Sequence, residues 1–260
     1  MLDYIYRGRQ LNLAHRGARM AAPENTLAAF RAALEMGADG IELDVQLSAD
    51  NALVVHHDFD LGRTNNGAGP LRKQTLAQLK RLDAGSWNDP EFARERIPTL
   101  AEVFQMLDRQ MVVNIEMKTR SFFDDGLEQA VVNEIKRSHM VDMVILSSFN
   151  PRSLMRVRNL SAQLPLGLLY SPDQPLHLRR AWLRRFVHPE ALHPRFDMVD
   201  EAFMSRAKED GYRVNVWTVN EAEDMERMLK LKVDAIITDR PNILRQVIDN
   251  AVKLTPALAQ

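Results

Sequence analysis

The chain has 260 residues, of which 45% are hydrophobic and 27% are charged, and its formal net charge is −1. This composition allows an ample core, and the balanced charge argues against nucleic-acid binding and against disorder. The absence of cysteine excludes disulfides, a thiolate nucleophile and zinc–thiolate sites. The N-terminus carries an early acid, Asp3, and no apolar run of signal-peptide length. Because no later segment has the roughly 20 apolar residues of a membrane span, we expect a cytoplasmic protein without stable membrane insertion.

Short apolar, β-branched runs alternate with longer helix-like stretches along the chain, which is the pattern of repeated βα units. The expected strands are 11–14, 40–46, 53–56, 112–117, 144–147, 166–169, 213–217 and 235–238. The expected helices lie near 25–36, 99–109, 126–138, 151–159, 175–186, 199–210, 221–231 and 241–253. Asn25 and Asn220 stand at expected helix N-caps, and Asn220 is followed by Glu223 three residues later.

About eight strands that alternate with helices over roughly 250 residues are typical of an α/β protein with a (β/α)8 TIM barrel. Residues 59–98 interrupt the rhythm with turn-rich runs, so we interpret them as an insertion after the second barrel strand. Neither half repeats the other and no Ser/Gly-rich linker divides the chain, which favours a single catalytic domain over residues 1–260. A doubly wound open sheet would usually carry a Gly-Xaa-Gly-Xaa-Xaa-Gly turn, and the chain lacks one.

Carboxylates stand near the ends of two neighbouring barrel strands, where a barrel places its catalytic groups. Glu42 and Asp44 are two residues apart, so their side chains leave the same face of a strand. Glu116 and Lys118 repeat this spacing on the next barrel strand. Three carboxylates at one barrel mouth would repel each other unless a hard cation such as Mg²⁺ or Ca²⁺ neutralised them. Helix capping or pairing with rim arginines is the alternative for Glu42 and Asp44.

His15 and His57 both follow apolar strand runs, so they should open onto the same face as the carboxylates. One deprotonated and one protonated histidine could act as a general base and a general acid. Arg16 offers a planar fork that matches phosphate geometry, with a rim ion pair as the alternative. We expect His56 to point the opposite way in a structural role, while Asp58 either orients His57 or caps the turn. With a cation and a lysine, this set suits phosphodiester hydrolysis.

Seven motifs, in this order along the chain, resemble the glycerophosphodiester phosphodiesterase family. They are His15-Arg16-Gly17, Pro23-Glu24-Asn25-Thr26, Glu42-Leu43-Asp44-Val45, His57-Asp58, Glu116-Met117-Lys118, Trp217-Thr218-Val219-Asn220 and Thr238-Asp239-Arg240-Pro241. The resemblance runs from about residue 11 to residue 245 and covers nearly all of the chain. It implies a (β/α)8 barrel with a small insertion after the second strand, and hydrolysis of glycerophosphodiesters to glycerol 3-phosphate and an alcohol.

The resemblance also implies roles for single residues. It implies that His15 and His57 form an acid–base pair. It implies that the ligands of one divalent cation are Glu42, Asp44 and Glu116. Phosphate would be bound by Arg16 and Lys118. Trp217 lines the pocket on the glycerol or alcohol side, with packing inside the barrel as its alternative. Which histidine donates the proton stays open. The glycerol 2-hydroxyl could also attack first and give a cyclic phosphate that water then opens.

A basic stretch in the second half of the chain allows two interpretations. Apolar residues spaced by four are flanked by arginines: Leu178, Trp182 and Phe186, with Arg179, Arg180, Arg184 and Arg185. We expect an outer barrel helix whose apolar stripe packs on the fifth and sixth strands. The alternative is a surface helix that touches anionic lipid.

Three functions are therefore compared. The first is a hydrolase whose partner is a small-molecule glycerophosphodiester, such as a choline or ethanolamine diester. The second is a lysophospholipase D-type enzyme that cleaves lysophospholipids at a membrane surface. The third is a non-catalytic binder of phosphate ligands on the same barrel, which would bind tightly without turnover. The sequence does not indicate an oligomeric state.

Overall fold

Eight parallel strands form a closed barrel in the computed structural model, which describes residues 2–119, 123–179 and 181–254. In barrel order the strands are β1 (Leu11–His15), β2 (Gly40–Leu47), β6 (Val112–Met117), β7 (Val144–Ser148), β8 (Leu166–Tyr170), β9 (Ala191–Pro194), β10 (Arg213–Val216) and β11 (Ala235–Thr238). The barrel closes because β1 pairs in parallel with both β2 and β11. The predicted (β/α)8 barrel is confirmed.

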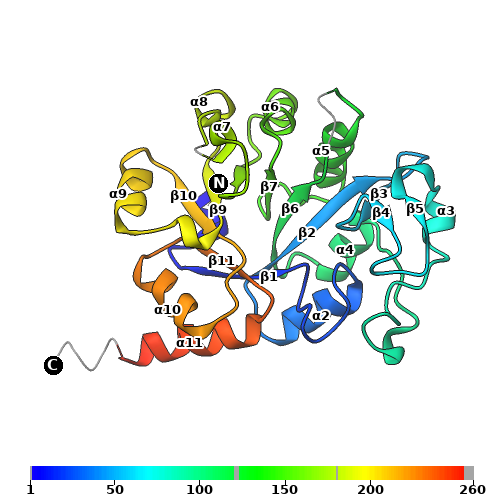
Figure 1. Cartoon of the computed structure of the whole chain (residues 1–260), viewed down its shortest axis with the longest axis horizontal. Helices are drawn as coiled ribbons and strands as arrows, with labels where there is room; N and C mark the ends of the chain where they lie inside the picture. The colour runs from blue at the N-terminus through cyan, green and yellow to red at the C-terminus, as the bar shows by residue number, and fades with distance from the viewer. Residues whose placement is uncertain (1, 120–122, 180, 255–260) are drawn as a thin grey trace.

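Helices follow the strands and surround the barrel (Figure 1). The longer ones are α2 (Leu27–Glu35), α4 (Leu100–Leu107), α5 (Leu127–Arg137), α6 (Pro151–Leu160), α9 (Glu201–Glu209), α10 (Ala222–Lys230) and α11 (Pro241–Leu254). The short α1 (Leu2–Tyr6) buries Ile5 and Tyr6 against residues that open strands β1 and β11, and so covers the N-terminal end of the barrel. In the described part of the chain, no helix combines the length and apolarity of a membrane span.

The strand at 53–56 is real but lies outside the barrel. It is β3 (Leu53–Val55), which turns back and pairs antiparallel with the end of β2. The barrel takes its sixth strand from β9 instead, which the sequence analysis missed. This strand has only four residues and ends in His193-Pro194, so it lacks the apolar, β-branched run that marks the other strands.

The single helix expected over 175–186 was wrong. Two short helices, α7 (Leu176–Arg179) and α8 (Arg184–Val187), stand in its place. Ala181 between them has a φ of +48°, and one left-handed residue is enough to end a right-handed helix. The expected apolar stripe is also wrong, because Trp182 and Phe186 are 53% and 67% exposed. Arg180 lies outside the described residues.

Residues 59–98 lie beside β2 and β3, between β3 and α4 (Figure 1). They contain the hairpin of β4 (Asp60–Leu61) and β5 (Gly69–Pro70) and the short α3 (Leu76–Leu79). Their own small apolar cluster consists of Val54, Leu61, Leu71, Leu79, Ala84 and Ile97. Because strand residue Val54 belongs to this cluster, the insertion packs on β3, which in turn pairs with barrel strand β2. The single-domain assignment over 1–260 stays a prediction.

The turn after β1 requires glycine at position 17. Gly17 has a φ of +83°, and a Cβ atom there would lie 2.7 Å from the backbone carbonyl carbon of Ala29. The turn can therefore pass against α2 only without a side chain, and this close approach fixes His15 and Arg16 at the end of β1.

We expect Gly17→Ala to lower the free energy of unfolding by roughly 2 to 4 kcal/mol, because left-handed strain and the collision with α2 add together. Urea unfolding measures this loss. Gly211→Ala is the matched control, since Gly211 has a φ of +78° but open space around it. It should cost only about 1 kcal/mol. Equal losses at both positions would contradict the packing argument.

Candidate active site

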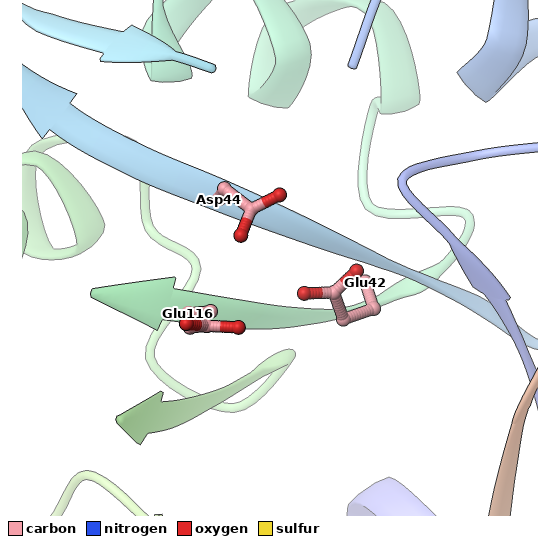
Figure 2. A group of neighbouring side chains, drawn as sticks. All are labelled: Glu42, Asp44 and Glu116. Atoms are coloured by element: carbon pink, nitrogen blue, oxygen red, sulfur yellow. The ribbon is translucent and has the colours of Figure 1, made fainter. Parts of the chain in front are cut away.

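Three carboxylates converge at the C-terminal end of the barrel. Glu42 and Asp44 point inward from β2, and Glu116 points inward from β6, where it stands directly beside Asp44 in the strand register. One oxygen atom from each side chain lies within 4.8 Å of those of the other two, as Figure 2 illustrates. The two-residue spacing thus brings all three predicted metal ligands together.

Burial and mutual repulsion set the protonation of this cluster. Burial, with Asp44 and Glu116 close by, raises the pKa of Glu42 well above its usual range. Burial also raises the pKa of Glu116, although Lys118 opposes the shift. For Asp44, burial acts in the same direction, but Lys118 and Arg16 outweigh it and lower the pKa. Burial and mutual repulsion make the charged forms of Glu42 and Glu116 unfavourable, and additional positive charge would stabilise them.

Arg16 and Lys118 supply the positive charge next to the cluster. The Nε atom of Arg16 lies 3.4 Å from Asp44 Oδ2, and Lys118 Nζ lies 2.9 Å from Glu116 Oε1 and 3.7 Å from Asp44 Oδ1. Both side chains are mostly buried, with 13% and 12% exposure. They are the residues predicted to bind phosphate, and they line the same site as the carboxylates.

His15 stands at the end of β1, beside Glu42 in the strand register. Its Nδ1 lies 2.6 Å from Asp239 Oδ1, and a carboxylate partner fixes the proton on Nδ1. This leaves Nε2 on the side of the cluster, 4.0 Å from Glu42 Oε2. Burial lowers the pKa of His15, although the hydrogen bond to Asp239 opposes the shift.

His57 reaches the same site by way of β3. The antiparallel pairing of β3 with β2 places the His56 backbone N–H 3.0 Å from the carbonyl oxygen of Asp44, and His57 follows. His57 Nδ1 lies 2.7 Å from Asp58 Oδ1, so Asp58 orients this ring. Burial lowers the pKa of His57, while the nearby Asp44 opposes the shift.

His56 faces the insertion instead. Its Nδ1 donates to the backbone oxygen of Asp58, and its Nε2 accepts from the side chains of Thr64 and Asn65. With both ring nitrogens engaged in this way, His56 links the insertion to β3. Its predicted structural position, away from His57, agrees with these contacts.

Glu24 is a site residue that the sequence analysis quoted only as part of a motif. Its buried carboxylate pairs with three arginines, at 2.8 Å from Arg16, 3.1 Å from Arg19 and 2.6 Å from Arg63. Burial would raise the pKa of Glu24, but these arginines lower it to about 2. Arg63 also binds Asp58, which orients His57. Glu24 therefore connects Arg16, the arginine predicted to bind phosphate, to the insertion.

The N-cap role predicted for Asn25 was wrong, because Thr26 caps α2 by accepting a hydrogen bond from the Ala29 N–H. Asn25 has a left-handed φ of +57°, and its side-chain amide donates to Asp44 Oδ2 at 2.9 Å. The local sequence pattern fits a helix N-cap as well as an asparagine that binds a site carboxylate. Only the position of Asp44 in space distinguishes these two roles.

Asp239 is the second site residue that the sequence analysis quoted only as part of a motif, without a role. It immediately follows β11 and binds His15, which is 224 positions earlier in the chain. Asn220, predicted as a helix N-cap, instead donates to Asp239 Oδ2 and accepts from the Asp239 N–H. Helix α10 starts after Glu221, which makes no side-chain cap. The motifs containing Asn220 and Asp239 therefore meet behind His15.

Trp217 follows β10 at the same end of the barrel and is partly buried. Its indole N–H donates to the backbone oxygen of His193 at 2.8 Å, and its ring meets Phe149 edge to face at 5.4 Å. These contacts hold the ring firmly, while its partly exposed surface leaves room for a ligand contact.

Comparisons with known proteins agree with this geometry. The model of the Glycerophosphoryl diester phosphodiesterase family matches residues 15–243. A glycerophosphodiester phosphodiesterase from Caldanaerobacter subterraneus subsp. tengcongensis is 44% identical over 90% of this chain and 96% of its own. An Oleispira antarctica phosphodiesterase, solved with the product sn-glycerol-3-phosphate, superposes with a TM-score of 0.82 at 33% identity, over 91% of this chain and 96% of that one.

The predicted family, fold and enzyme class are thereby confirmed. The match begins at His15 and extends past Asp239, so it includes every residue of the site described above. The chain belongs to the glycerophosphoryl diester phosphodiesterase family, whose members are phosphoric diester hydrolases.

Proposed function

We propose that this chain hydrolyses small-molecule glycerophosphodiesters to glycerol 3-phosphate and an alcohol, with one divalent cation and a histidine acid–base pair. The observation that carries the proposal is the convergence of three carboxylates, two histidines and two cationic side chains at one end of the barrel. The product bound to the Oleispira antarctica relative supports glycerol 3-phosphate as the product here. The cytoplasmic location expected from the sequence stays a prediction.

The carboxylate cluster fits a hard cation. Its donors are all oxygen atoms, which Mg²⁺ and Ca²⁺ prefer, and the buried Asp44 Oδ1 has no hydrogen-bond partner within the described residues. Glu42, Asp44 and Glu116 would hold the ion. When bound, it would neutralise the cluster and polarise the phosphate oxygens.

Arg16 and Lys118 would bind the remaining phosphate oxygens and balance the negative charge that grows during attack. Glu24 holds one guanidinium nitrogen of Arg16 at 2.8 Å, which keeps the fork in place before the substrate arrives. Lys118 is held by its contact with Glu116 at 2.9 Å. Trp217 would form the wall on the glycerol or alcohol side.

The two histidine rings are oriented in the same way. Each one has a carboxylate on Nδ1, Asp239 for His15 and Asp58 for His57, so each has Nε2 available to exchange a proton. One ring would take the proton of the attacking hydroxyl, and the other would give a proton to the leaving alkoxide. The same pair would serve attack by water or by the glycerol 2-hydroxyl.

Release of glycerol 3-phosphate from a panel of glycerophosphodiesters tests this proposal. We expect a chelator to abolish release and added Mg²⁺ or Ca²⁺ to restore it. His15→Ala and His57→Ala should each lower kcat by about 10²- to 10⁴-fold, because each removes a proton-transfer group. His139→Asn, which changes an exposed histidine, should have no effect. Full activity in chelator contradicts the cation, and tight ligand binding without turnover contradicts hydrolysis.

We also expect Asp239→Asn to lower kcat by about 10²-fold or more while KM changes little, because an amide no longer fixes the proton on His15 Nδ1. Steady-state kinetics on the preferred diester measure the separate changes in kcat and KM. Asp142→Asn, which removes a surface carboxylate paired with Arg109, is the control. An unchanged kcat in the Asp239 variant would show that His15 does not need this partner.

A further inference from the structure

The connection between β8 and β9 carries a group of residues that the active site does not use. Residues 174–189 contain four arginines and no aspartate or glutamate, although the whole chain has a net charge of −1. Two large apolar side chains of this segment, Trp182 and Phe186, are more than half exposed. A basic stretch of this kind is typical of a surface that meets a partner, since ordinary outer barrel helices bury their aromatic residues.

A cavity of about 680 Å³ opens beside this segment, between α8 and α9. In Figure 1, α8 and α9 are neighbours on the outer edge of the molecule. Four arginines line the cavity together with aromatic side chains that include Trp182 and Phe203. The broken helix explains this space, because two short helices cover less of β8 and β9 than one continuous helix would. Tyr170 of β8 and Leu192 of β9 form part of the lining.

Among the described residues, an acidic partner compensates only one of the four arginines that line the cavity. Arg184 pairs with Asp210 at 3.3 Å. In contrast, Arg179, Arg185 and Arg206 make no ion pair among the residues that the structure describes. None of the described lining residues is acidic. Three unpaired guanidinium groups around one cavity attract a dense negative charge, such as that of phosphate groups.

We propose that Arg179, Trp182, Arg185, Phe186 and Arg206 form an arginine–aromatic patch that docks the protein onto a bilayer surface containing anionic phospholipid. Arginines would bind the lipid phosphates, while the exposed tryptophan and phenylalanine would enter the interface between headgroups and acyl chains. The aromatic side chains favour a bilayer over an acidic peptide, because the interface between headgroups and acyl chains accommodates both arginines and aromatic rings. The docking does not depend on the proposed hydrolysis, since binding is its own readout.

Co-sedimentation with vesicles tests the patch. We expect the protein to bind vesicles of phosphatidylcholine with about 30% phosphatidylglycerol at low salt, and to bind pure phosphatidylcholine weakly. Binding should fall as salt shortens the Debye length from about 30 Å at 0.01 M to about 8 Å at 0.15 M. Arg185→Ala with Arg206→Ala should weaken binding roughly 25-fold, about fivefold for each arginine. Trp182→Ala should weaken binding about fivefold or more.

Arg31→Ala and Trp87→Ala are the matched controls, since they remove an exposed arginine and the other exposed tryptophan away from the patch. Both should bind vesicles like the unaltered protein. All variants should keep the same thermal unfolding midpoint, which separates lost docking from lost folding. No binding to anionic vesicles at low salt overturns the proposal. Undiminished vesicle binding by the patch variants also overturns the proposal. Binding to RNA with no binding to vesicles does so as well.

Discussion

Repulsion among three buried carboxylates is the constraint on which the rest of this structure depends. Glu42, Asp44 and Glu116 are brought within 4.8 Å by the parallel pairing of β2 and β6, and the barrel cannot separate them without changing its register. Burial, followed by repulsion from Asp44 and Glu116, raises the pKa of Glu42, whereas Lys118 and Arg16 lower the pKa of Asp44. In the proposed function, a divalent cation would neutralise the charge of this cluster.

Around this cluster, each of the side chains proposed to act in catalysis has a charged partner, which is adjacent in sequence for His57 (Asp58) and 224 positions away for His15 (Asp239). Arg16 has a left-handed φ of +56° and is fixed by Glu24, which also binds Arg63 of the insertion. The insertion thereby acts on the site through Asp58, which Arg63 binds and which orients His57. His15 at the end of β1 and His57 after β3 thus lie beside the same carboxylate cluster. Charge pairing of this kind would orient the side chains before a substrate binds.

Much of this could be predicted because periodicity and strand-end position are local signals. The two-residue spacing of Glu42 and Asp44 determines their common face, and the barrel then determines their meeting with Glu116. The strand β9 could not be predicted, because its four residues have weak strand propensity of their own. They are held in the sheet by pairing with β8 on one side and β10 on the other. Asn25 and Asn220 looked like helix N-caps because an asparagine that caps a helix and one that binds a carboxylate of the site have the same local sequence pattern. The pairing of Asp239 with His15 spans 224 positions, and only closure of the barrel between β1 and β11 creates it.

Direct measurement of cation binding tests the central claim most sharply, because it does not depend on turnover. Mn²⁺ can be titrated into the metal-free protein, followed by electron paramagnetic resonance, and then displaced by added Mg²⁺ or Ca²⁺. The account predicts one site per chain, which Asp44→Asn weakens by at least tenfold and which Asp142→Asn, a change in a surface carboxylate, leaves unchanged. Binding of equal strength in the unaltered protein and in Asp44→Asn, or no binding in either, would contradict it.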